Sequence, residues 1–148
     1  MRRRLVALAG VLLVAAVQAG PPAATSADGR WRLVADGTAL TVFDASGQPV
    51  RRHVVASAAG VFDVPPRRSF VVVFDTLPEL WEISYDPQAE PIYHGLVHDY
   101  RLREGIAEPG FLNARRTRLD APLREPGYDS SHAFVIARAP DQADGQAV

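Results

Sequence analysis

The sequence of 148 residues contains no cysteine, no lysine and a single methionine. The absence of cysteine excludes disulfides, cysteine-linked lipid anchors and covalent attachment of a c-type haem, which requires a Cys-x-x-Cys-His motif. The absence of lysine makes each of the 16 basic residues an arginine. Arginine binds carboxylates through paired hydrogen bonds, although a GC-rich genome would produce the same bias.

Neither sign of charge is in large excess. The 16 arginines stand against 17 acidic residues, for a net charge of −1 and an isoelectric point of about 6.4. Because the arginines are spread along the chain, they form no basic stripe of the kind that binds nucleic acid, and we expect no such partner. Hydrophobic residues make up 47% of the chain, which suits a globular core, and the length favours one domain.

The first 19 residues have the three parts of a secretory signal peptide. Residues 1–4 are basic, residues 5–17 are apolar, and residues 17–19 (Val-Gln-Ala) match a small-x-small cleavage pattern. The apolar run is shorter than the roughly 20 residues that a membrane-spanning helix needs. We therefore predict an exported protein, periplasmic or secreted, with no stable membrane span after cleavage; an uncleaved anchor is the alternative.

Residues 69–87 (SFVVVFDTLPELWEISYDP) carry the clearest structural pattern. Residues 70–74 form a continuous apolar run rich in β-branched residues, and Trp81, Ile83 and Tyr85 alternate with polar residues. A buried run, a break containing Pro78 and a run of period two predict two strands of an antiparallel hairpin.

Shorter strands are predicted on either side of this hairpin. They cover residues 31–34, 38–45, 50–56 and 133–137, with Asp-Gly or Ser-Gly turn signals at several boundaries. This spacing is typical of an all-β sandwich, barrel or propeller. Gly60 marks either a β-bulge or a loop, and we favour the loop. Residues 20–28 read as an unstructured linker, residues 86–123 as one long irregular excursion, and residues 139–148 as a flexible tail.

Four segments together resemble the cytochrome d1 haem-domain family, the β-propeller of cd1-type nitrite reductases and of haem d1 assembly proteins. They are residues 28–50 (DGRWRLVADGTALTVFDASGQPV), 62–87 (FDVPPRRSFVVVFDTLPELWEISYDP), 91–123 (PIYHGLVHDYRLREGIAEPGFLNARRTRLDAPL) and 128–137 (YDSSHAFVIA). The family's ring has eight four-stranded blades. The resemblance therefore implies an all-β, propeller-type domain over residues 29–138, a truncated member with about two blades and an incomplete ring. Open strand edges would then invite self-association or a partner.

The resemblance also implies haem d1 as the cofactor. The segments that carry the family's iron-ligating histidines have no counterpart here, so no iron ligand is transferred. Arg67 and Arg68 are candidate contacts for the carboxylates of haem d1, with the cluster at 115–118 as a further basic patch. Ordinary surface charge is the alternative for all of them.

The histidines offer little chemistry from sequence alone. His98, beside Asp99, fits the long excursion of the family and is our third candidate for cofactor binding. His94 and His98 are four residues apart, but Gly95 lies between them and no metal site is predicted. We expect His132 to support the Asp-Ser-Ser-His turn and His53 to lie on an exposed strand face.

Three functional hypotheses follow. The first is an exported, fragment-like and non-catalytic family member that binds or handles haem d1 in denitrification. The second is a periplasmic interaction module that uses exposed strand edges. The third is an enzyme of haem d1 assembly, which would need His98 and Asp99 for proton transfer.

Overall fold

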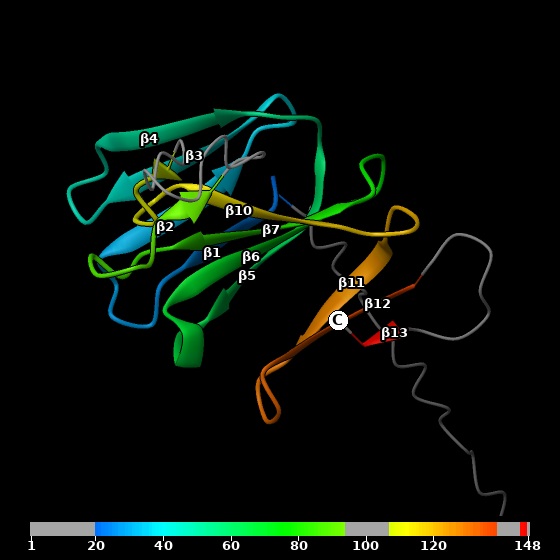
Figure 1. Ribbon diagram of the computed structural model, residues 1–148. Helices are drawn as coiled ribbons and strands as arrows, with labels where there is room; N and C mark the ends of the chain where they lie inside the picture. The colour runs from blue at the N-terminus through cyan, green and yellow to red at the C-terminus, as the bar shows by residue number, and fades with distance from the viewer. Residues whose placement is uncertain (1–19, 94–106, 139–145, 148) are drawn as a thin grey trace, which may run out of the picture.

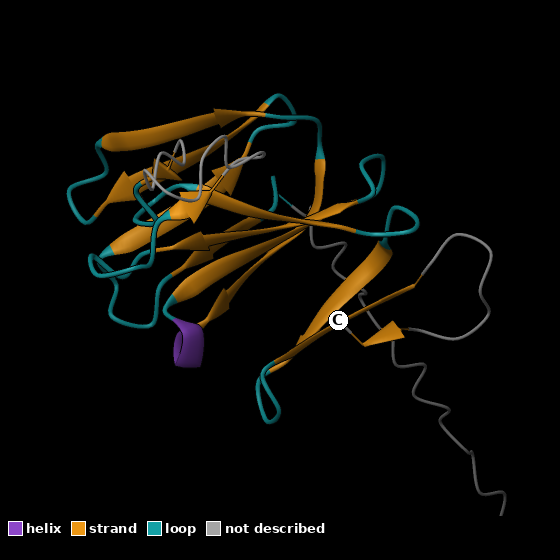
Figure 2. Cartoon of the chain, in the orientation of Figure 1, coloured by secondary structure: helices purple, strands orange, loops and turns teal. Residues whose placement is uncertain are grey.

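The computed structural model describes residues 20–93, 107–138 and 146–147, and this part of the chain is almost entirely β-structure (Figures 1 and 2). The predicted signal peptide, His94, His98, Asp99 and residues 139–145 of the predicted tail lie outside the described residues. No helix among the described residues is long and apolar enough to cross a membrane.

The first sheet has four antiparallel strands in sequence order. They are β1 (Ala23–Thr25), β2 (Trp31–Ala35), β3 (Ala39–Asp44) and β4 (Pro49–Val54). Aspartates close its turns, because Asp36 Oδ1 accepts the N–H of Thr38 and Asp44 Oδ1 accepts the N–H of Ser46, each at 2.8 Å. Strands β2 to β4 confirm the predicted strands.

The second sheet contains the predicted hairpin. Its strands are β5 (Ala58–Val64), β6 (Ser69–Phe74), β7 (Glu79–Ser84) and β10 (Ala114–Arg118), with β5 at one edge and β10 at the other. Strands β6 and β7 pair antiparallel, from Ser69 opposite Ser84 to Val73 opposite Leu80, which confirms the hairpin. A short 3-10 helix, η1 (Pro65–Arg67), joins β5 to β6.

Two smaller sheets complete the described chain. The third sheet has strands β11 (Arg124–Asp129), β12 (Phe134–Arg138) and β13 (Gln146–Ala147) in sequence order. A two-stranded ladder of β8 (Ile92–Tyr93) and β9 (Ala107–Glu108) stands on the connection between β7 and β10.

The first three sheets stack face to face, with the second sheet in the middle (Figure 1). Their first strands lie side by side, since β5 contacts both β1 and β11. Every residue of β6 is buried, because Phe70, Val72 and Phe74 pack toward the first sheet while Val71 and Val73 pack toward the third. This double coverage explains the continuous apolar run in the sequence.

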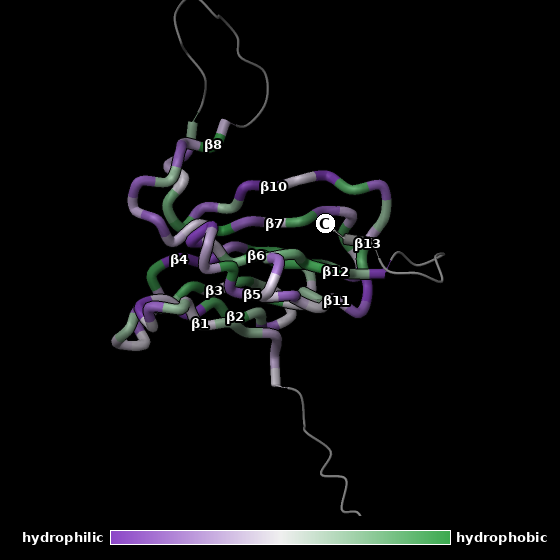
Figure 3. The backbone as a smooth tube through the Cα atoms, turned by 90° about the horizontal axis from the view of Figure 1, so that it is seen from below, coloured by the Kyte–Doolittle hydropathy of each residue, from purple (hydrophilic) through white to green (hydrophobic). Residues whose placement is uncertain are grey.

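The stacking shows propeller-type blades, two with four strands and one with three among the described residues, without a closed ring. Figure 3 shows the hydrophobic colouring along the middle of the stack and a largely hydrophilic β10 at the outer edge of the second sheet. The predicted fold class is therefore confirmed.

Four local predictions are wrong. The linker at 20–28 contains β1, whose residues pair with β2. The excursion at 86–123 contains β10, and the tail contains β13, paired with β12. Gly60 lies at a bulge in β5 rather than in a loop. A Cβ atom there would lie 2.7 Å from Pro126 of the third sheet, so close packing between sheets requires the glycine.

Candidate functional site

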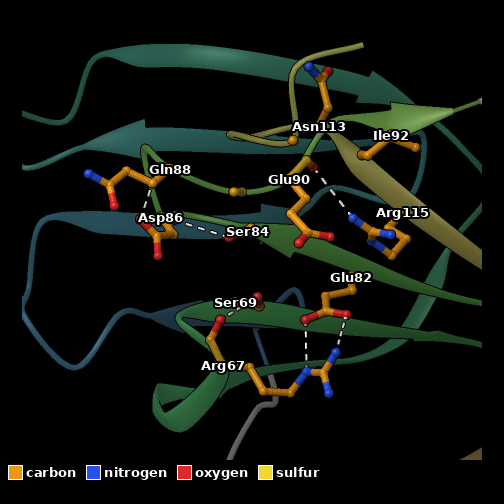
Figure 4. Close-up of a pocket in the computed structure, with 12 residues that line it drawn as sticks. Arg67, Ser69, Glu82, Ser84, Asp86, Gln88, Glu90, Ile92, Asn113 and Arg115 are labelled. Atoms are coloured by element: carbon orange, nitrogen blue, oxygen red, sulfur yellow. Dashed lines mark hydrogen bonds and ion pairs between the residues drawn. The ribbon is translucent and has the colours of Figure 1, made fainter. Parts of the chain in front are cut away.

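A polar hollow of about 460 Å³ opens on the second sheet beside the base of the β8–β9 ladder (Figure 4). Its lining includes the side chains Arg67, Ser69, Glu82, Ser84, Asn113 and Arg115. Ligand pockets in proteins commonly have volumes of about 300–1,000 Å³. The hollow is therefore large enough for a small ligand or for one edge of a larger one.

Strand alternation determines which side chains reach the hollow. On the face of the second sheet that points toward the third, Val71, Val73 and Leu80 pack against the third sheet. Ser69, Glu82 and Ser84 occupy the rest of the same face and line the hollow instead. One half of this face is thus packed and the other half is polar and open.

Glu82 lines the hollow and is bound by Arg67. Arg67 Nε and Nη2 donate to its two carboxylate oxygens, each at 2.8 Å. Burial opposes ionisation of Glu82, but hydrogen bonds from Arg67 and Ser69 outweigh it, and the pKa of Glu82 is lowered. The arginine that the sequence offers as a ligand contact is therefore already paired with a carboxylate of the chain itself.

Arg68 has a different position and a different partner. Its backbone is left-handed, with φ of 49°, at the end of η1. Its guanidinium Nη1 lies 3.2 Å from Asp86 Oδ2, and its carbonyl accepts the N–H of Tyr85 at 2.9 Å. Arg68 thus joins the start of β6 to the end of β7, and only its partner Asp86 lines the hollow.

The basic cluster at 115–118 is divided between two faces of β10. Arg115 stands opposite Glu82 in the strand register and lines the hollow, where its Nη2 lies 3.5 Å from the carbonyl of Glu90. Arg116 points to the other face, with its guanidinium carbon 4.2 Å from the centroid of the Trp81 ring. The hollow therefore holds Arg67, which is paired with Glu82, and Arg115, whose described hydrogen bond is the long one to the carbonyl of Glu90.

Close backbone packing holds the base of the ladder beside the hollow. A Cβ atom on Gly110 would lie 2.1 Å from the carbonyl oxygen of Glu90, so only glycine fits there. Asn113 is buried, donates to the carbonyl of Pro109 at 2.9 Å and accepts a hydrogen bond from Arg51 of the first sheet. These contacts anchor the rim of the hollow to both sheets.

The two described histidines are both engaged. His53 is half-buried, and its Nε2 donates to the carbonyl of Leu112 at 3.0 Å, so the prediction of an exposed face was wrong. His132 Nδ1 lies 2.8 Å from Asp129 Oδ2, while Asp129 also accepts the N–H of Ser131, as expected for a structural turn. Within the described ranges, no three acidic or histidine side chains form a metal-binding group.

Comparison with known proteins shows a likeness to solved structures. No model of a known protein family matches the chain, and no curated protein matches it. Among solved structures, the chain resembles "Dihydro-heme d1 dehydrogenase NirN in complex with DHE", with a TM-score of 0.61 and 23% sequence identity. The match covers 85% of this chain and 25% of that one, so the chain spans about a quarter of the length of that protein. The likeness shows that the stacked sheets have the fold of part of the cytochrome d1-like dehydrogenase.

Proposed function

We propose that the protein is an exported, non-catalytic module that binds a tetrapyrrole of the haem d1 class through the ligand's carboxylates. The support is the fold likeness to a protein solved in complex with DHE, together with a hollow that contains two arginines. The likeness extends to the fold only, so the ligand is argued from the residues of this chain.

The hollow fits the carboxylates of such a ligand better than its iron. Because the contact of Arg115 with the carbonyl of Glu90 is long, its guanidinium is the group that would first bind a carboxylate of the ligand. Arg67 could provide a second contact only by exchanging Glu82 for the ligand. Neither described histidine lines the hollow, and for this reason we assign no iron ligand and propose binding without catalysis.

Each residue of the hollow would then have its own role in binding the ligand. Arg115 binds one carboxylate, Ser69 and Ser84 offer hydroxyl groups, and Glu82 holds Arg67 away from the ligand until a competing anion displaces it. The tetrapyrrole would supply any redox chemistry, and this chain would orient and shield one edge of it.

Titration of the purified protein with haem d1, followed by its visible absorbance, tests the proposal. We expect a saturable spectral change in the parent protein and a weakening of about tenfold or more in Arg115→Gln, because a charge-assisted hydrogen bond is lost. Arg118→Gln is the matched control, since Arg118 is an exposed residue of the same strand and does not line the hollow. Absence of binding by the parent would refute the function; equal binding by Arg115→Gln would refute the site.

The strand-edge hypothesis receives less support from the described edges. Strand β4 contains Pro49, Arg51 and Arg52, and β10 contains three arginines. Proline and charged side chains on an edge strand hinder pairing with a further strand. A periplasmic partner that binds by strand addition therefore stays a prediction, as does a haem d1 assembly enzyme based on His98 and Asp99.

A further inference from the structure

The three stacked sheets pack in the same way along the chain, each with the same one of its two faces against the sheet that follows. We call the side of a sheet that faces the following sheet along the chain its forward face, and the opposite side its backward face. The forward face of the first sheet packs on the backward face of the second through Leu40, Val42 and Phe70, among others. The forward face of the second packs on the backward face of the third through Val71, Val73 and Val135, among others.

The forward face of the third sheet carries two exposed apolar side chains and meets no other sheet among the described residues. Along β12, Val135 and Ala137 are buried against the second sheet, whereas Phe134 and Ile136 point the other way and are 51% and 44% exposed. Ile136 pairs across the sheet with Gly127, which has no side chain to cover it. Two large apolar side chains thus project from one end of the stack.

The backward face of the first sheet provides a matching recess at the other end. An apolar-lined hollow of about 480 Å³ lies there, with Val34, Phe43 and Thr25 in its wall. Val54 lies further along the same face and is 76% exposed. In the described chain this face meets no other sheet, since the core contacts of the first sheet come from its forward face.

We propose that a second copy of the chain docks head to tail, so that Phe134 and Ile136 of one copy enter the recess beside Val34 and Phe43 of the next. This contact repeats the forward-to-backward stacking that joins the sheets within one chain. It is heterologous, and such contacts build a ring where the rotation closes and a longer array where it does not. The proposal does not depend on tetrapyrrole binding.

Charge at the two faces agrees with this arrangement. Asp129 stands opposite Phe134 in the register of the third sheet and lies on the forward face. Arg32 stands opposite Phe43 on the backward face of the first sheet and lines the recess. Head-to-tail docking joins the face that carries Asp129 to the face that carries Arg32. The forward face also holds the ion pair of Arg138 with Glu125, and Asp44 also lines the recess.

Sedimentation velocity of the purified chain over a range of concentrations tests the proposal with two variants. Phe134→Glu damages only the forward face, and Phe43→Arg damages only the recess. Tyr93→Glu, at a residue of β8 that is 65% exposed and outside both faces, is the control. Circular dichroism checks that each variant folds, and Val54→Arg replaces Phe43→Arg if the latter does not fold.

We expect the parent and Tyr93→Glu to associate with increasing concentration and each face variant alone to stay monomeric. An equimolar mixture of Phe134→Glu and Phe43→Arg should form a one-to-one dimer, because each variant keeps the face that the other has lost. A monomeric parent would overturn the proposal and leave the faces to a different chain. Association that persists in either face variant, or a mixture that stays monomeric, would also overturn it, since pairing through edges, like faces or residues 1–19 predicts those results.

Discussion

The hydroxyl of Tyr85 donates a hydrogen bond of 2.8 Å to Oδ1 of Asp63, inside the contact between the first and second sheets. Asp63 also accepts the backbone N–H of Ala27, which follows β1. Burial is the main cause that raises the pKa of Asp63 and the pKa of Tyr85. The partly buried carboxylate of Asp63 therefore joins the two sheets, and the hydrogen bonds from its donors compensate for its burial.

Replacement of Tyr85 by phenylalanine should destabilise the protein by about 1–3 kcal/mol, since the Asp63 carboxylate would lose a donor while still partly buried. Urea unfolding of the parent and variant measures the difference. Asp63→Asn in the same background completes a double-mutant cycle, and we expect a coupling energy of about 0.5–1.5 kcal/mol between the two sites. Additive effects of the two changes would show that the hydrogen bond contributes nothing to stability.

His53 should make stability depend on pH near neutrality. Burial lowers the pKa of His53 below 6.5, with Arg51 and Arg116 acting in the same direction and the hydrogen bond to Leu112 opposing them. The unfolded state therefore binds this proton more readily than the folded state. The stabilisation is complete above pH 6.5 and is lost as the pH falls through the lower pKa of the folded state.

Urea midpoints measured from about pH 7 to pH 5 should fall for the parent and change less for His53→Gln. His132→Gln is the control, because His132 is an exposed residue that lies in a turn of the third sheet. Parallel curves for the parent and His53→Gln would exclude His53 as the source of the pH dependence.

The sequence predicts the middle of the fold better than its margins. The run at 70–74 could be recognised because both of its faces are covered, and burial on both sides leaves an apolar signature. Strand β10 could not, because only Ala114 of its five residues is buried. Strand β1 consists of two alanines and a threonine, a composition that carries no strand pattern.

The candidate site was predictable in its residue types but not in its pairings. Arg67 and Arg68 could be singled out as carboxylate-binding residues, and Arg115 only as part of the basic cluster at 115–118. The common relation of Arg67 and Arg115 to Glu82 follows from the register of β7 with β10 and from the turn at η1. His53 was misplaced because its partner, the carbonyl of Leu112, belongs to the turn before β10, far away in the sequence. Contacts between sheets leave no periodic mark in the sequence.

Two phenylalanines in opposite environments test the stacking. Phe70 is fully buried between the first and second sheets, and Phe134 is half exposed on the third. Phe70→Ala should cost about 3–5 kcal/mol through lost burial and a cavity, whereas Phe134→Ala in dilute protein should change stability by about 0.5 kcal/mol or less. Equal losses in urea unfolding would contradict the stacked arrangement, and Phe70→Leu gives a graded value if the alanine variant does not fold.

Glu82→Gln separates the pairing of Arg67 with Glu82 from its proposed binding of an anionic ligand. The change removes the charge that holds the guanidinium, so Arg67 becomes available to an anionic ligand, and the variant should bind haem d1 more tightly than the parent. Stability should fall by about 1 kcal/mol or less, because Arg67 is largely exposed. Titration by visible absorbance measures the affinity, and Glu79→Gln, whose partner is the Trp81 ring N–H outside the hollow, is the matched control. Weaker binding by Glu82→Gln would mean that Glu82 itself contacts the ligand and that Arg67 is not its carboxylate partner.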